Sequence, residues 1–98
     1  MKEKGKILQI LRKKKSILRN YGVKRIGLFG SYLKNEQNTE SDIDILIDFF
    51  PEKETFDNFM KVCEILEDAF PAYKLDIVTK NGLSKYIGSY ILKETEYA

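Results

Sequence analysis

One segment, residues 41–49, constrains the fold more than any other because apolar and polar positions alternate along it. The apolar positions are Ile43, Ile45, Ile47 and Phe49, and those between them are Asp42, Asp44, Leu46 and Asp48. A period of two in a segment rich in β-branched residues predicts a strand with one buried face. Asp42 and Asp44 then share the other face, about 6.5–7 Å apart along the backbone. Asp48 lies on that face too, where we expect a solvated structural residue.

Asp42 and Asp44 form a candidate cation site. Two like charges this close repel each other unless a cation lies between them. Oxygen ligands without a nearby Cys or His favour Mg²⁺ or Mn²⁺, which hold one or two carboxylates and fill their remaining positions with water and phosphate oxygens. On its own, a pair of aspartates two residues apart is more often a solvated pair at a sheet edge.

A small-residue turn precedes the aspartates and makes their pattern more specific. Residues 24–29 predict a short strand that runs into Gly30 and Ser31, and a short helical stretch is expected to follow. Such a turn lets backbone N–H groups approach a phosphate closely, and the serine hydroxyl adds a donor. By itself a Gly-Ser pair is a weak signal, since most are ordinary turns. Its fixed distance from the two aspartates predicts a metal-bound nucleotide here.

The rest of the chain alternates helices with strands. The spacing of apolar residues predicts helices at 3–21, 55–69 and 83–95, and a further strand at 74–79. We expect the apolar and aromatic stripes of the last two helices to be core rather than base-stacking platforms. These stripes comprise Phe56, Phe59, Met60, Cys63, Leu66 and Phe70 in one helix, and Leu83, Tyr86, Ile87, Tyr90 and Ile91 in the other. Residues 35–40 predict a polar loop whose mobility can gate substrate entry.

Length and cysteine content set the outer limits. The chain has 98 residues, of which 43% are apolar, enough for one small domain with a single core, and we assign residues 1–98 to it. The one cysteine, Cys63, fits a buried structural thiol rather than a disulfide or a nucleophile, as in a reducing cytoplasm. No signal peptide or apolar run of about twenty residues is visible, so the pattern supports neither secretion nor membrane insertion.

Charge is distributed unevenly along the chain. Residues 1–25 contain ten Lys or Arg and one acidic residue, whereas residues 26–98 contain seven basic and fourteen acidic ones. The basic run at 12–15 invites contact with nucleic acid or an acidic protein. The same helix carries an apolar stripe whose opposite face must be polar, so a solvated helix face is the favoured interpretation. Aromatic residues that would stack on single-stranded bases are sparse there.

Several of these segments together resemble a known family. The turn at 30–31, the eleven-residue step to Ser41 and the aspartate strand resemble the signature of the minimal nucleotidyltransferases in the DNA polymerase beta superfamily. Residues 74–79 are similar to that family's third strand, which carries a third carboxylate, here Asp76. The tail at 83–97 resembles the ending of these short proteins. The resemblance implies an α/β (α+β) fold like the polymerase beta palm, with a small mixed sheet of about three or four strands flanked by helices.

The resemblance also implies roles for individual residues. Asp42 and Asp44 would hold two divalent metals that bridge the triphosphate, and Asp76 would complete the metal site and serve as general base toward the acceptor hydroxyl. The residues that would hold the nucleotide are Gly30, Ser31, Lys34 and Ser41.

The sequence departs from the family pattern just after the turn. Leu33, Lys34 and Asn35 stand where many relatives have Ala-Arg-Gly. Lysine keeps the positive charge but lacks the bidentate fork of arginine. Asparagine tolerates the left-handed backbone that glycine would adopt.

The resemblance implies a function as well. It is the transfer of a nucleoside monophosphate, with AMP from ATP as the favoured case, onto an acceptor hydroxyl with Mg²⁺ or Mn²⁺. Small proteins of this family often act as antitoxins that bind a helical HEPN-type ribonuclease toxin and adenylylate one of its tyrosines. So short a domain offers little surface to enclose both a base and an acceptor, so we expect a partner chain to complete the site.

Two alternatives stay open. One is a binding module that neutralises a partner by contact alone, and the other is nucleotidyl transfer to a small molecule or RNA end, for which a homodimer could build the cleft.

Overall fold

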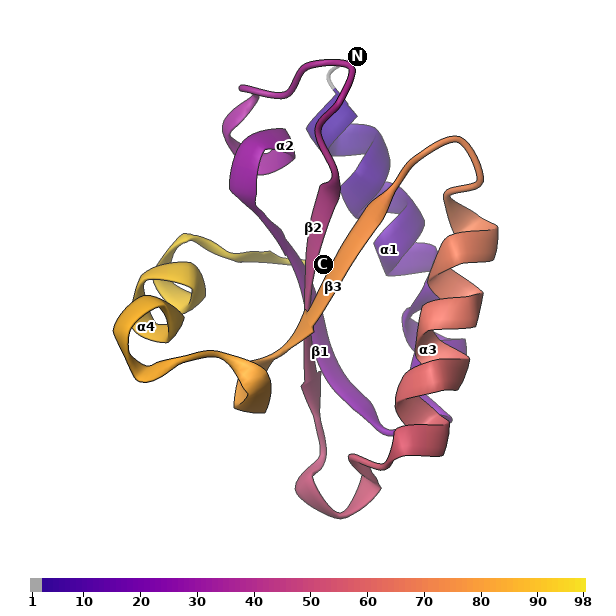
Figure 1. Cartoon of the computed structure of the whole chain (residues 1–98). Coiled ribbons are helices and arrows are strands. Elements are labelled where there is room, and N and C mark those ends of the chain that lie inside the picture. Colours follow the sequence, from indigo (N-terminus) through magenta and orange to yellow (C-terminus); the bar gives the residue numbers. More distant parts are fainter. Residues whose placement is uncertain (1–2) are drawn as a thin grey trace.

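A four-stranded mixed sheet with helices on both sides forms the body of the protein (Figure 1). The computed structural model describes residues 3–98. In chain order the elements are α1 (Glu3–Arg19), β1 (Val23–Phe29), α2 (Gly30–Lys34), β2 (Ile43–Phe49), a 3-10 turn (Pro51–Lys53), α3 (Phe56–Ala69), β3 (Leu75–Thr79), a second 3-10 turn (Lys80–Gly82), α4 (Lys85–Glu94) and β4 (Glu96–Tyr97).

The order of strands across the sheet is β3-β2-β1-β4. Strand β2 runs antiparallel to β1 and parallel to β3, and β4 runs antiparallel to β1. The predicted fold class, α+β with a small mixed sheet flanked by helices, is confirmed. Strand β4 contains only two residues, too few for a periodic pattern, and sequence reasoning did not locate it.

Capping residues explain why two helices begin one or two positions later than predicted. Thr55 Oγ1 accepts a hydrogen bond from the Asn58 N–H at 3.1 Å, and Ser84 Oγ accepts one from the Ile87 N–H at 3.3 Å. Each hydroxyl satisfies a backbone donor that has no partner within the helix, so the capping residue itself stays extended.

The core lies between one face of the sheet and the pair α1 and α3, which Figure 1 shows on the same side of the sheet. The alternation predicted for β2 is confirmed on this face, and its four core residues are Ile43, Ile45, Ile47 and Phe49. Helix α1 supplies Ile7, Leu8, Leu11 and Leu18, while α3 supplies Val62 and Leu66. Burial of these branched side chains is the main source of stability. On the other face of β2, Leu46 and Asp48 are also buried, and Asp44 is half-buried near the start of the strand.

Helix α4 stands on the opposite side of the sheet from α1 and α3 (Figure 1), and its aromatic stripe is not core. Tyr86 is 94% exposed and Tyr90 is 64% exposed, and on α3 Phe56 is 76% exposed. The prediction that these aromatics are buried is therefore wrong. Helical spacing reports that a helix has an apolar side, but it does not tell what covers that side. Exposed aromatic side chains one helical turn apart, as Tyr86 and Tyr90 are on α4, are typical of binding surfaces.

Asp48 is buried, 8% exposed, and the prediction of a solvated residue is wrong for it. Arg25 lies opposite Asp48 in the β1–β2 register, and its Nε and Nη2 donate to Asp48 Oδ2 at 3.3 and 3.1 Å. The guanidinium also lies 4.3 Å from the centroid of the Tyr97 ring on the other side of β1. Arg25 thus neutralises a buried carboxylate and helps to hold β4 in place.

Replacing Arg25 with methionine is expected to destabilise the fold. The change leaves the Asp48 carboxylate buried without its partner, and an unsatisfied buried group costs about 1–3 kcal/mol. Urea unfolding measures the difference in free energy. The matched control is Lys24→Met on the neighbouring exposed residue, which is expected to change the free energy of unfolding by no more than about 0.5 kcal/mol. Equal effects of the two changes would contradict the assigned role of the Arg25–Asp48 pair.

Candidate active site

Neighbouring strands bring the predicted carboxylates to one corner of the sheet. In the register, Asp44 on β2 pairs with Asp76 on β3 and with Phe29, the last residue of β1. Asp42 lies directly before β2 and is exposed, as is Asp76, whereas Asp44 is half-buried. Since Ile43 and Ile45 face the core, the aspartates lie on the sheet face that α1 and α3 leave open. Asp42 and Asp76 are far apart in sequence, and only the parallel pairing of β2 and β3 brings them together.

The surroundings of Asp44 disfavour the charged form of its carboxyl group. Burial, the charge of Asp76 and a hydrogen bond shared with the Asp76 carboxyl raise the pKa of Asp44 to about 6, and Asp42 and Glu94 add to the effect. Three aspartates thus place negative charge in one small volume, whereas Glu94 has Lys34 as its partner. A site of this kind favours an incoming cation.

Gly30 forms the turn at the end of β1 with a left-handed backbone, φ 75°. A Cβ at this position would overlap the Asp44 carboxylate. The glycine is required both for its backbone conformation and because the Asp44 side chain occupies the space beside it. The turn and the aspartate strand, which sequence analysis linked only by their spacing, are in direct contact.

Glu94, the last residue of α4, reaches the same turn from the far end of the chain. Its Oε1 accepts a hydrogen bond from the Gly30 N–H at 2.9 Å, and its Oε2 lies 3.2 Å from Lys34 Nζ. Hydrogen bonding to Glu94 and its charge raise the pKa of Lys34. Lys34 Nζ also lies 5.8 Å from the centroid of the Tyr90 ring. Sequence reasoning did not assign Glu94 to the site, because no local pattern indicates a contact across 64 positions.

The remaining predicted nucleotide-binding residues frame the turn and the loop. Ser31 lies in α2, and Asn35 ends that helix in the left-handed conformation, φ 61°, in agreement with its predicted tolerance for it. Ser41 Oγ accepts the Asn38 N–H at 3.0 Å and so closes the polar loop before β2. A hollow beside this loop is lined by Tyr32, Thr39, Glu40, Ser41, Ala72, Tyr73 and Lys74. The roles of Ser31, Lys34 and Ser41 toward nucleotide stay predictions.

The aspartates fit Mg²⁺ as an open site rather than a closed cage. Within residues 3–98, no three carboxylate or thiol side chains are gathered closely enough to enclose an ion on their own. Mg²⁺ is usually held by one or two carboxylates, several waters and the phosphates of its nucleotide, so an enclosing cage is not needed. The adjacent carboxyls of Asp44 and Asp76, with Asp42 at the rim, supply oxygen ligands of the required kind.

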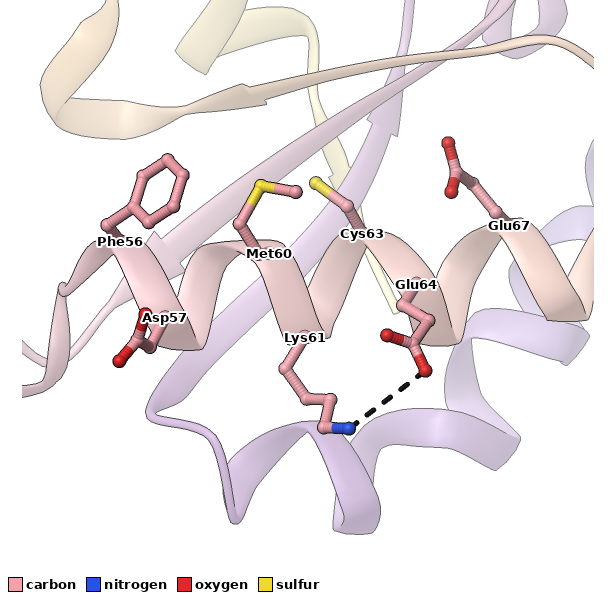
Figure 2. Close-up of a pocket in the computed structure, with 7 residues that line it drawn as sticks. All are labelled: Phe56, Asp57, Met60, Lys61, Cys63, Glu64 and Glu67. Atoms are coloured by element: carbon pink, nitrogen blue, oxygen red, sulfur yellow. Dashed lines mark ion pairs between the residues drawn. The ribbon is translucent and has the colours of Figure 1, made fainter.

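A second hollow runs along α3, and none of the aspartates of the candidate site lines it (Figure 2). Figure 2 shows its seven lining residues: Phe56, Asp57, Met60, Lys61, Cys63, Glu64 and Glu67. All of them come from one helix, so no second element closes over a ligand there. Cys63 is half-buried rather than buried as predicted, and burial, with the nearby Glu67, raises the pKa of its thiol. A raised pKa opposes the thiolate form that a nucleophile needs.

Comparison with known proteins identifies the family of this chain. The family described as the nucleotidyltransferase domain matches residues 5–98. The chain belongs to this nucleotidyltransferase family. A Methanocaldococcus jannaschii protein provisionally named a protein adenylyltransferase is 38% identical over 99 residues, covering 98% of this chain and 94% of that protein. The protein adenylyltransferase MntA of Thermococcus cleftensis is 36% identical over 86 residues, covering 86% of this chain and 83% of that protein. The resemblance to the minimal nucleotidyltransferases is confirmed, and the protein is a nucleotidyltransferase by family.

Solved structures share the fold of this nucleotidyltransferase. A structure provisionally described as a minimal nucleotidyltransferase is 26% identical, with a TM-score of 0.73, covering 91% of this chain and 93% of the other. The crystal structure of a toxin-antitoxin with AMP-PNP is 22% identical, with a TM-score of 0.65, covering 97% of this chain and 71% of the other. Among residues 3–98 of the nucleotidyltransferase, no helix is both long and apolar enough to span a membrane.

Proposed function

We propose that this nucleotidyltransferase is an antitoxin that uses Mg²⁺ to transfer AMP from ATP to a tyrosine hydroxyl of a HEPN-type toxin, with release of pyrophosphate. The observation that carries the proposal is the contact of the left-handed Gly30 turn with Asp44, which itself pairs with Asp76 across β2 and β3. This arrangement sets a candidate phosphate turn against a candidate metal site. The adenylyltransferase names of the relatives and the toxin-antitoxin neighbour support the choice of reaction and partner. A cytoplasmic location, where ATP is available, is part of the proposal.

Each residue of the site has a stated task in this proposal. The acidic side chains Asp42, Asp44 and Asp76 hold Mg²⁺, with Mn²⁺ as a substitute. When bound, the metal neutralises charge on the phosphate oxygens during in-line attack at the α-phosphorus. Asp76 accepts the proton of the attacking hydroxyl. Gly30 and Ser31 form the turn against the outer phosphates, and Lys34 pairs with their charge.

A protein acceptor fits the open shape of the site better than a free small molecule does. The aspartates lie at the end of a sheet, where Asp42 and Asp76 are exposed. Helix α4, whose last residue contacts the phosphate turn, presents Tyr86, Ile87 and Tyr90 to solvent. An exposed aromatic and aliphatic face next to a reaction centre is suited to holding a folded partner. The basic face of α1, with exposed Arg12, Lys13 and Lys15, is a second surface for an acidic partner.

The test of the proposal is label transfer to the product of the adjacent gene. Purified protein is incubated with that partner, Mg²⁺ and ATP labelled at the α-phosphate, beside the Asp42→Asn/Asp44→Asn double variant and a sample with chelator. We expect label on the partner with wild type alone, and its loss when the acceptor tyrosine found by mass spectrometry is changed to phenylalanine. A tight complex without label would show a binding module instead, and label on RNA or a small molecule would replace the proposed acceptor.

A further inference from the structure

The two acceptor atoms of Glu94 are both used, and both partners belong to the candidate phosphate site. Oε1 takes the Gly30 N–H at 2.9 Å and Oε2 takes Lys34 Nζ at 3.2 Å. The Glu94 side chain is only 17% exposed, whereas that of Lys34 is 42% exposed. One carboxylate at the end of α4 therefore fixes the backbone of the turn and the cation beside it at the same time.

Displacing Glu94 from these partners would be costly. A phosphate that took the Gly30 N–H would leave Oε1 of a mostly buried carboxylate without its donor, close enough to Asp44 to contribute to its raised pKa. Lys34 carries three N–H donors, so pairing with Glu94 leaves two free for phosphate oxygens. The arrangement is thus suited to keeping Glu94 in place while nucleotide binds.

We infer that Glu94 is a positioning residue for nucleotide, which it serves by holding Lys34 and the Gly30 turn in their phosphate-binding arrangement. Lysine has a flexible stem and lacks the rigid fork of an arginine. Ordering such a side chain before the ligand arrives removes an entropy cost that binding would otherwise carry. Glu94 thereby holds the side chain of Lys34 in one place. The inference rests on the proposed function, since it assigns nucleotide phosphates to this turn.

The test measures binding of AMP-PNP with Mg²⁺ by calorimetry, so that it does not depend on turnover. Glu94→Gln retains a carbonyl oxygen for the Gly30 N–H but loses the charge that pairs with Lys34. We expect this change to weaken binding about three- to tenfold, the effect of ordering one long side chain. In the Lys34→Met background the same change is expected to alter binding less than about twofold, because the two residues act through one interaction. The matched control, Glu96→Gln, removes an exposed ion pair with Lys4 and is expected to leave the Kd unchanged.

Melting curves and the Gly30 amide resonance separate positioning from a general structural effect. Glu94→Gln is expected to keep the melting temperature and the Gly30 amide resonance close to those of wild type. Glu94→Ala is expected to shift the resonance, because it removes the oxygen that accepts the Gly30 N–H. Binding that is equal to or tighter than wild type in Glu94→Gln would overturn the inference, the tighter result showing that Glu94 competes with phosphate. An undiminished effect in the Lys34→Met background would also overturn it. Absence of nucleotide binding by wild type would overturn the proposed function itself, and the inference with it.

Discussion

Asp44→Asn is expected to abolish nucleotidyl transfer and, in the same protein, to raise the melting temperature of the metal-free form. The amide cannot replace the carboxylate as a ligand at the centre of the acidic group, and loss of charge stabilisation at such a site costs about 10³-fold or more in rate. The gain in stability follows from the raised pKa of Asp44, which reports that its charge is disfavoured in the folded protein. Activity would here be maintained at the expense of stability.

The sign of the pH dependence follows from the same carboxyl. The folded protein binds the Asp44 proton up to a pKa of about 6, whereas the unfolded chain releases it near 3.8. Between these values the folded state holds more protons, so this group makes stability fall as the pH rises from about 4 to 6. Because Asp44 is partly exposed, solvent screening reduces the effect to about 1 kcal/mol at pH 7. That corresponds to about 4–8 °C for a domain of this size.

Melting curves at several pH values, without metal, measure the predicted effect beside two controls. Asp42→Asn is expected to lose activity with a smaller change in melting temperature, because Asp42 is exposed. Asp57→Asn, in the first turn of α3, is expected to retain activity. If Asp44→Asn melted at a lower temperature than wild type at pH 7, the account of charge repulsion at this site would be wrong.

Gly30→Ala is expected to impair both folding and catalysis. Alanine in the left-handed conformation costs about 1–2 kcal/mol, and its methyl group would overlap the Asp44 carboxylate. Together these effects are expected to lower the free energy of unfolding by about 2–4 kcal/mol. The carboxylate or the turn must shift to make room, and a displacement of about 1 Å at a reacting centre costs about 10²-fold in rate.

Urea unfolding and the rate of label transfer measure the two effects of Gly30→Ala. The matched control is Gly5→Ala within α1, where the loss of backbone freedom in the unfolded chain is expected to stabilise the protein by about 0.5–1 kcal/mol. Transfer at the wild-type rate in a stably folded Gly30→Ala protein would show that the close contact with Asp44 has no catalytic role.

Both the predicted and the missed features of the site have clear physical origins. The β2 strand was predicted because alternation of apolar and polar residues is a property of adjacent positions, and its core face is confirmed by Ile43, Ile45 and Ile47. The role of Asp48 was missed because its partner Arg25 is set by strand register, which the alternation does not contain. The exposure of Tyr86 was missed because the periodicity of a helix does not tell what packs against it.

From the sequence alone, the resemblance of its motifs to a known family implied the nucleotidyltransferase family and the α+β fold. Periodicity and turn residues, which are local properties, predicted the order of the main elements. The tertiary structure alone decided the contacts between distant segments. It set Asp44 against Asp76 through parallel pairing of β2 and β3, and it brought Glu94 to the Gly30 turn across 64 positions. Such contacts depend on how the elements pack together, and no stretch of neighbouring residues encodes them.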